Sequence, residues 1–510
     1  MWRRNALLSA VGLIVWGCLV PAAHPEGGTL RVGMPSVPPA LDPATAVATP
    51  ARMLARQVFD TLVQFRAGSS DVEAALASQW TVSKNGLVWT FRLREGVRFH
   101  DGTALTSHHA VASIERQLFP GHPLAPAGPA VAPSLLRGAP GVVKEIRAPD
   151  ARTIQIRLQQ PYAPLPTALA HPALSIVLPA PDGTGRWLGT GPFSVAESTA
   201  GRLTLDANRA YWGGAPRVAR VVFVEVSEDT RALADLDERA LDVWLPAGAS
   251  SRTAGAVSVP GWRIGFLAMQ TEKEPFSRRK ARQAVAVALD PERIEAALGL
   301  GAAALPSFLP PGLWGGGAPP GRIMKADAAA ARRLLGEAGL PRGVTTSLLM
   351  VGGAAGDEQA RLGEALRAML APAGIAVQPR PMPPDEMLSL AQNGEHQMAL
   401  MEARAEGGDP HYLLYPLSTS EAAVKGRSAW NLSFYRNPRL DDLLIRASQL
   451  SFRPERQRVY ERAQTLLGEE VPWLPLYVRR HWAVLRPEVK GLRLHPSGQH
   501  RFDRVTLEVR

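Results

Sequence analysis

Residues 79–118 read QWTVSKNGLVWTFRLREGVRFHDGTALTSHHAVASIERQL, and the local organisation of the chain is clearest in this stretch. Over residues 87–94 apolar and polar side chains alternate, a period of two that predicts a strand with one buried face. The preceding Asn85-Gly86 readily supplies the positive φ angles of a tight turn. The pattern therefore predicts a hairpin in which this strand pairs with residues 80–82.

A helix is expected soon after the hairpin. Residues 97–100 have the character of a short strand, which an Asp-Gly turn ends. Thr106 then stands where a helix N-cap is expected, and Val111, Ile114 and Leu118 recur at helical spacing on the predicted inner face. Farther along, residues 218–226 alternate as a strand, residues 230–236 can form a helix capped by Asp229, and residues 241–244 return as a strand. This alternation of strand and helix is typical of α/β proteins.

The composition indicates a large globular protein. The chain has 510 residues, of which 46% are hydrophobic and 20% charged, so it should divide into two or three lobes with sizeable cores. The formal charge of +11 comes mostly from arginines scattered along the chain. Because clustered basic runs with interleaved aromatic residues are absent, no nucleic-acid partner is expected. A mild preference for anionic partners stays open.

The first residues have the pattern of an export signal. Arg3 and Arg4 precede an apolar run over residues 6–20, and small residues follow it. This order predicts a signal peptide over residues 1–23. A retained membrane helix is the alternative, although the run is short for the roughly 20 residues that a spanning helix needs.

Cys18 is the only cysteine of the chain, and residues 15–18 resemble a lipoprotein cleavage box. Lipid anchoring at Cys18 is therefore an alternative to ordinary cleavage after the signal. If ordinary cleavage occurs, the mature chain has no thiol, which excludes disulfides, thiolate metal sites and cysteine nucleophiles.

The opening stretch also follows the pattern SW-x-x-S-x-[DN]-G-x-x-x-TF-x-LR-x-GV-x-FHDG-x-x-[LF]T. In this respect the chain closely resembles the family-5 extracytoplasmic solute-binding proteins, the peptide/nickel/opine-binding group that serves ABC importers. It is similar to the dipeptide- and oligopeptide-binding proteins among them. The matching residues are Trp80, Ser83, Gly86, Thr90, Phe91, Leu93, Arg94, Gly96, Val97, Phe99, His100, Asp101, Gly102 and Thr106.

Further family patterns recur along almost the whole mature chain. They include an LDP at residues 41–43, a GTGPF turn at 189–193, a YWGG at 211–214, a PPG-x-W at 310–314 and a P-x-x-PLY at 472–477. The resemblance implies an α/β, periplasmic-binding-protein-like fold of the large class II type, with two lobes, a hinge and an extra inserted region. It assigns residues 28–65, 186–270 and 489–510 to lobe I, 66–185 to the inserted region of lobe I and 271–488 to lobe II.

The same resemblance points to ligand contacts in the segment that follows residue 400. The family's pattern W-x-x-D-x-x-DP places its amine-pairing acid on Glu406 and its DP turn on Asp409-Pro410. A carboxylate that faces an ammonium group in a closed cleft makes charge-assisted hydrogen bonds of roughly 1.5–3 kcal/mol. Trp314, from the PPG-x-W segment, is also counted among the ligand-binding residues. An exposed loop glutamate is the alternative interpretation of Glu406.

Two departures from the family pattern concern specificity. Ala403 replaces the family's tryptophan, and Arg404 next to it introduces a cation, so the preference for ordinary peptides is open. His411 follows the DP turn, as in nickel-binding relatives, and is counted as a ligand-binding candidate. No second histidine or carboxylate has ligand spacing to it, and a metal site needs a set of ligands. We therefore expect no metal and no cofactor.

The expected function is capture of a small polar solute between two lobes. By resemblance the solute is a peptide or peptide-like compound, delivered by a periplasmic monomer to an ABC transporter permease in the inner membrane. A nickel chelate or an opine as ligand, or a periplasmic sensor or chaperone on the same scaffold, are the alternatives. Nucleophile and zinc-protease motifs such as G-x-S-x-G and H-E-x-x-H are absent from the sequence, so no enzyme activity is expected.

Overall fold

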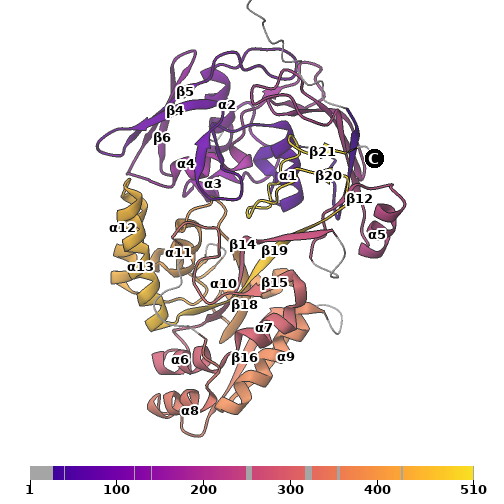
Figure 1. The fold of residues 1–510 in the computed structure, drawn as a ribbon. Helices are drawn as coiled ribbons and strands as arrows, with labels where there is room; N and C mark the ends of the chain where they lie inside the picture. The colour runs from indigo at the N-terminus through magenta and orange to yellow at the C-terminus, as the bar shows by residue number, and fades with distance from the viewer. Residues whose placement is uncertain are drawn as a thin grey trace, which may run out of the picture.

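The computed structural model describes residues 27–39, 41–119, 121–138, 141–248, 255–315, 324–352, 357–426 and 429–508. The expected signal peptide and Cys18 lie outside this range. The chain forms two lobes joined by long strands, and the N-terminal third lies in the upper one (Figure 1). Among the described residues, no helix combines the length and apolarity that crossing a bilayer requires.

One mixed sheet runs through both lobes in the order β10-β11-β12-β1-β13-β19-β14-β18-β16-β17, with β15 at the side of β19. Its lobe I half combines parallel pairing of β1 with β12 and β13 and an antiparallel β10-β11-β12 meander. The elements of this half are β1 (Thr29–Met34), α1 (Thr49–Val58), β10 (Phe193–Thr199), β11 (Arg202–Ala207), β12 (Arg220–Glu225), α5 (Asp229–Asp237) and β13 (Val243–Trp244).

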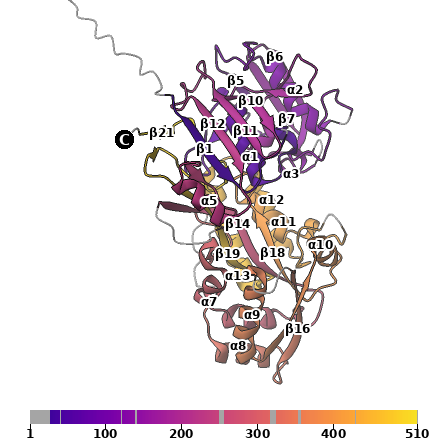
Figure 2. The same cartoon turned by 90° about the vertical axis from the view of Figure 1, so that its right-hand side faces the viewer.

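Two long strands, β14 (Ala256–Met269) and β19 (Trp473–Leu485), connect the lobes. β19 pairs with β13 of lobe I at one end, whereas β14 pairs with β18 (Met398–Arg404) of lobe II at the other. Their mutual pairing shifts register between Pro260 and Ile264, and such an irregularity lets a strand pair bend. Both strands pass between the lobes (Figure 2). Strands β14 and β19 are therefore shared between the lobes. The residue ranges that the family resemblance assigns to each lobe stay a prediction.

The predicted hairpin is confirmed in the inserted region. Trp80 pairs with Phe91, and Gly86 takes φ 71° in the connecting turn. Thr106 begins the next helix in a capping box, its backbone N–H donating to Nδ1 of His109 over 3.1 Å. The short strand predicted over residues 97–100 is not formed, and this segment contributes only an isolated bridge between Arg98 and Ala104. The region contains the β4-β5-β7-β6 sheet and a hairpin: β2 (Val63–Phe65), β3 (Val72–Ala74), β4 (Ala77–Val82), β5 (Val88–Leu93), α2 (Ser107–Leu118), α3 (Ala132–Leu135), β6 (Val143–Asp150), β7 (Thr153–Leu158) and α4 (Leu165–Leu169).

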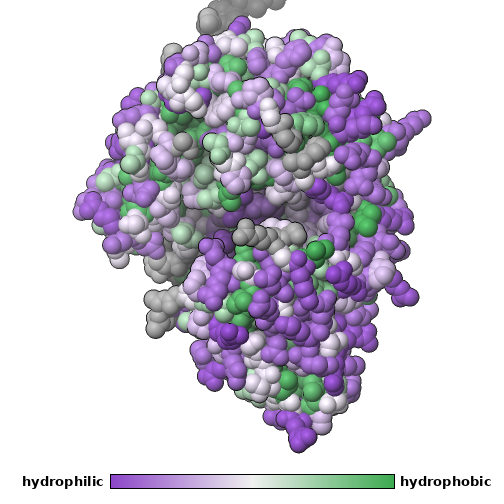
Figure 3. Space-filling view, turned by 180° about the vertical axis from the view of Figure 1, so that it is seen from behind, coloured by the Kyte–Doolittle hydropathy of each residue, from purple (hydrophilic) through white to green (hydrophobic). Residues whose placement is uncertain are grey.

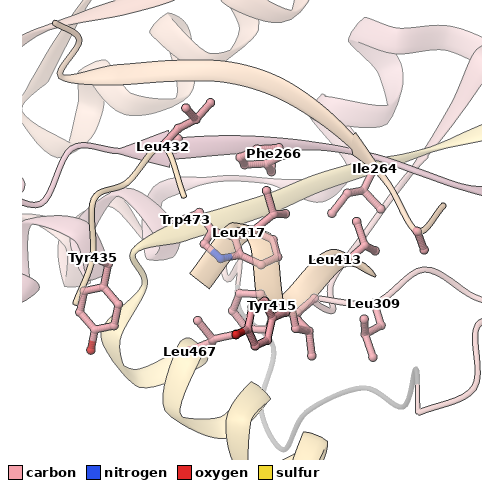
Figure 4. Packing of buried hydrophobic residues seen from close by; sticks show 14 of the residues in the cluster. Ile264, Phe266, Leu309, Leu413, Tyr415, Leu417, Leu432, Tyr435, Leu467 and Trp473 are labelled. Atoms are coloured by element: carbon pink, nitrogen blue, oxygen red, sulfur yellow. The ribbon is translucent and has the colours of Figure 1, made fainter. Parts of the chain in front are cut away.

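Lobe II is a three-layer arrangement with helices on both faces of the sheet. Along β14, Ile264 and Phe266 belong to one buried cluster and Leu267 to another on the opposite face, as expected of a strand covered on both sides. The first cluster packs around Trp473 (Figure 4). The remaining elements are α6 (Arg279–Ala288), α7 (Pro291–Leu298), β15 (Ala302–Ala304), α8 (Ala328–Glu337), β16 (Val344–Val351), α9 (Glu358–Leu370), β17 (Ile375–Met382), α10 (Pro384–Gln392), α11 (His411–Ser418), α12 (Pro438–Gln449) and α13 (Arg453–Glu470).

Candidate functional site

Glu406 lies between the lobes, in the loop that follows β18. The backbone N–H of Ala405 donates to the carbonyl of Trp262 over 3.0 Å, which extends the β14-β18 pairing by one residue before the chain turns. A guanidinium nitrogen of Arg52, on α1 of lobe I, donates to Oε2 of Glu406. Arg52 is held by a second hydrogen bond, from its Nε to the carbonyl of Ala46 at 3.0 Å, and its side chain is 5% exposed. Glu406 of lobe II and Arg52 of lobe I therefore form an ion pair across the cleft.

His171 contacts the same carboxylate from the inserted region. Its ring precedes the short 3-10 helix Pro172–Leu174, and Nδ1 accepts a hydrogen bond of 3.1 Å from the backbone N–H of Ala173. The neutral ring therefore carries its proton on Nε2, which is 3.7 Å from Oε2 of Glu406. Burial lowers the pKa of His171 to about 4, so the ring is neutral at pH 7.

The Glu406 carboxylate stays ionised despite its position. Burial alone would raise its pKa, but the nearby His171 ring and the two guanidinium groups of Arg52 and Arg404 lower it to about 2. The contacts with Arg52 and His171 both fall on Oε2, which leaves Oε1 without a donor in the described part of the chain. The side chain is 30% exposed. One carboxylate oxygen is therefore available to a ligand.

Arg404 ends β18 next to this carboxylate. Its Nη2 donates to the hydroxyl of Thr49, at the start of α1, over 2.8 Å. Its Nη1 is buried and has no hydrogen-bond partner among the described residues. Burial lowers the pKa of Arg404 to about 10, so the guanidinium still carries its charge at neutral pH. Arg404 therefore presents a charged donor that the chain itself does not use.

Asp409 and Trp314 contact residues outside the cluster around Glu406. The Asp409 side chain is 1% exposed and binds Arg456 of α13 through both oxygens, each at 2.9 Å. The Trp314 ring faces the Arg456 guanidinium at 4.7 Å, and its backbone N–H donates to the Ser70 hydroxyl at 3.0 Å. Trp314 thus contacts both lobes, whereas Asp409 is engaged inside lobe II.

His411, at the start of α11, is buried where lobe II meets the inserted region. Its ring centroid lies 4.7 Å from that of Tyr415 and 5.3 Å from that of Tyr162. Burial holds its pKa well below the usual value, and Nδ1 has no hydrogen-bond partner among the described residues. Within the described ranges, no group of three or more histidines, cysteines or acidic residues could hold a metal ion.

The lobes contact each other beside these residues. The Tyr162 hydroxyl donates to that of Tyr412 over 3.2 Å, and Arg137 forms an ion pair of 2.8 Å with Glu421. Seen from behind, the molecular surface is hollowed between the two lobes (Figure 3). The chain is therefore in an arrangement in which the lobes touch around a polar, partly buried cluster.

The site is thus only partly the one that the sequence indicated. Glu406 and Arg404 lie in one cluster with Thr49, Arg52 and His171, and the last three were not among the residues that the sequence indicated. Arg52 and Arg56 lie four residues apart, hence on one face of α1, and two arginines on a helix face that is otherwise buried were a usable signal. The sequence contains no such signal for His171, because a lone histidine before a proline belongs to no known motif.

A comparison with known protein families identifies the family to which this chain belongs. Residues 71–424 match the model of the bacterial extracellular solute-binding proteins, family 5. The chain belongs to this family.

Relatives of this solute-binding protein span nearly its whole length. Heme-binding protein A of Haemophilus influenzae is 30% identical over 89% of this chain and 87% of its own. The dipeptide-binding protein of Escherichia coli is 28% identical over 88% of this chain and 89% of its own.

Solved structures share the two-lobed α/β fold of this solute-binding protein. HbpA2 from Haemophilus parasuis has a TM-score of 0.86 at 24% identity, over 94% of this chain and all of its own. DppA from Helicobacter pylori, in complex with the peptide STSA, has a TM-score of 0.75 at 26% identity, over 95% and 98% of the two chains.

Proposed function

We propose that this solute-binding protein captures a small peptide or peptide-like solute between its lobes and delivers it unchanged to an ABC importer. The observation that carries the proposal is the pair formed by Oε1 of Glu406 and the buried Nη1 of Arg404, an acceptor and a donor of opposite charge that both lack a hydrogen-bond partner among the described residues. A relative of known structure was solved with a peptide, and two curated relatives are named as dipeptide- and di/tripeptide-binding proteins.

A peptide offers one ammonium and one carboxylate group, which match these two positions. The ammonium group would bind Oε1 of Glu406, and a carboxylate would bind Nη1 of Arg404. Each is a charge-assisted hydrogen bond, about twice as strong as a neutral one. The role of Trp314 is proposed as a wall that closes with the lobes, since it contacts Ser70 across them. Asp409 and His411 act in this proposal by supporting lobe II and the contact between the lobes.

The mechanism that we propose is a shift in the population of lobe arrangements. A ligand that touches α1 of lobe I and the loop after β18 of lobe II has more contacts when the lobes meet, and therefore favours that arrangement. No bond of the solute is made or broken. Export by the N-terminal signal would place the protein in the periplasm, where it would meet the permease as a monomer.

The role of Glu406 is tested by replacing it with glutamine. The E406Q variant keeps the size of the side chain but loses the negative charge, so we expect affinity for peptides with a free amine to fall tenfold or more. Calorimetry on the mature chain with Ala-Ala, Ala-Ala-Ala and their N-acetylated forms measures this. The acetylated peptides are the internal control, because they should bind weakly to both proteins. Unchanged affinity of E406Q for the free peptides would remove Glu406 from the site.

A thermal-shift screen and solution scattering test the function as a whole. A true ligand at about 1,000 times its Kd stabilises the folded chain by roughly 4 kcal/mol. We expect at least one peptide to raise the melting temperature and reduce the radius of gyration. Turnover of a peptide, or neither stabilisation nor compaction with any of them, would contradict the proposed function.

A further inference from the structure

Most of the charges around the site are paired with one another among the described residues. On the side of lobe II, Arg263 binds Glu402 over 2.6 Å, and Arg479 binds both Glu402 and Glu358. These two arginines and two glutamates cancel. On the side of lobe I, the cations Arg56 and Arg501 lie near the carboxylates Asp60 and Asp503, which also cancel.

Inside the site itself the positive and negative charges do not cancel. Arg52 and Arg404 are charged, Glu406 is the carboxylate that faces both of them, and His171 is neutral. Oε2 of Glu406 serves Arg52. Among the described residues the Arg404 side chain makes a single hydrogen bond, to the neutral hydroxyl of Thr49. His481, whose charge would also act on Arg404, is neutral because burial lowers its pKa to about 4. The site therefore carries one positive charge in excess.

An excess charge in a closing cleft favours an anionic ligand. Removing an unpaired ion from water is costly, whereas an opposite charge with a good hydrogen bond offsets the cost. A neutral dipeptide brings one ammonium and one carboxylate and leaves the excess in place. A peptide with one additional carboxylate cancels it.

We infer that this protein prefers acidic peptide-like solutes with a net charge of −1, and that Arg404 is the residue that selects them. This inference rests on the proposed function. Arg404 receives a carboxylate of the solute on Nη1, while Glu406 holds the ammonium group on Oε1.

Matched peptides that differ by one charge test the inference. Calorimetry compares Ala-Glu with Ala-Gln, and Ala-Ala-Glu with Ala-Ala-Gln, on the mature chain. We expect the glutamate peptide of at least one pair to bind tenfold or more tightly than its amide, with a preference that weakens as salt is added. In R404M the two members of each pair should bind alike, and R404K should restore part of the preference.

Arg263 supplies the matched control. It lies opposite Arg404 in the pairing of β14 with β18, but its side chain is half exposed and forms an ion pair with Glu402. R263M should keep the preference. Equal binding of the two members of both pairs by the natural chain would overturn the inference and leave the proposed function standing. A preference that survives in folded R404M, or disappears equally in R263M, would remove Arg404 as its source. Absence of binding by all four peptides and by Ala-Ala would overturn the proposed function together with the inference.

Discussion

Replacing Asp409 by alanine is expected to lower the free energy of unfolding by about 3–5 kcal/mol, the usual cost of removing one partner from a buried ion pair. The carboxylate is 1% exposed and accepts two hydrogen bonds of 2.9 Å from Arg456. It also accepts one of 3.0 Å from the backbone N–H of His411, at the start of α11. The alanine variant leaves the Arg456 guanidinium buried without its counter-ion. Urea denaturation of the mature chain measures the loss.

A double-mutant cycle separates the charge from the packing. In D409A/R456M no charge is left unpaired, so the double variant should be more stable than D409A alone. A loss below about 1 kcal/mol in D409A would contradict the account of a buried pair. D409N also tests whether Asp409 contacts the solute. If the folded D409N variant keeps its peptide affinity, the residue supports the fold of lobe II and lies outside the ligand site.

Acid is expected to destabilise the protein strongly between about pH 7 and pH 4. The unfolded chain binds protons on its histidines near pH 6.5. In the folded chain, burial prevents the histidines named below from binding protons until about pH 4 or below. The free energy of unfolding is therefore flat above about pH 7 and falls as the pH decreases, by up to about 1.4 kcal/mol per pH unit for each histidine. Burial lowers the pKa to about 4 for His171, His396, His481 and His495, and still further for His411 and His500.

Melting temperatures at pH 8, 7, 6 and 5 measure this effect, and we expect a drop of roughly 5–10 °C between pH 7 and pH 5. The H396Q variant, at a site with no exposed surface, should show a shallower dependence than the natural chain. H108Q, on the exposed side of α2, serves as the reference substitution. A melting temperature that is constant from pH 8 to pH 5 would show that the folded chain accepts these protons.

The local elements were predictable because short-range physics fixes them. The β4-β5 hairpin follows from alternation and an Asn-Gly turn, and α2 follows from the cap at Thr106. The short strand expected over residues 97–100 failed, because a strand depends on a partner that only the tertiary fold provides.

Only those residues of the site that lie within a family sequence pattern could be predicted. Glu406 and Arg404 were located by their position in that pattern, and the structure brings both into one cluster. Arg52 and His171 come from segments more than 200 residues away in the chain. Contacts over such separations depend on how the lobes pack, and no local pattern encodes them.

The sequence by itself determined the family, the α/β class and the chemistry available after β18, since these depend on motifs and on patterns within a few residues. Only the tertiary structure decided which of these groups are already used. Asp409 is bound to Arg456, and one oxygen of Glu406 is bound to Arg52, whereas a nitrogen of Arg404 has no partner among the described residues. The physical reason is that charge balance in a cleft is a property of the assembled lobes, because each buried ion is stabilised or not by neighbours from distant parts of the chain.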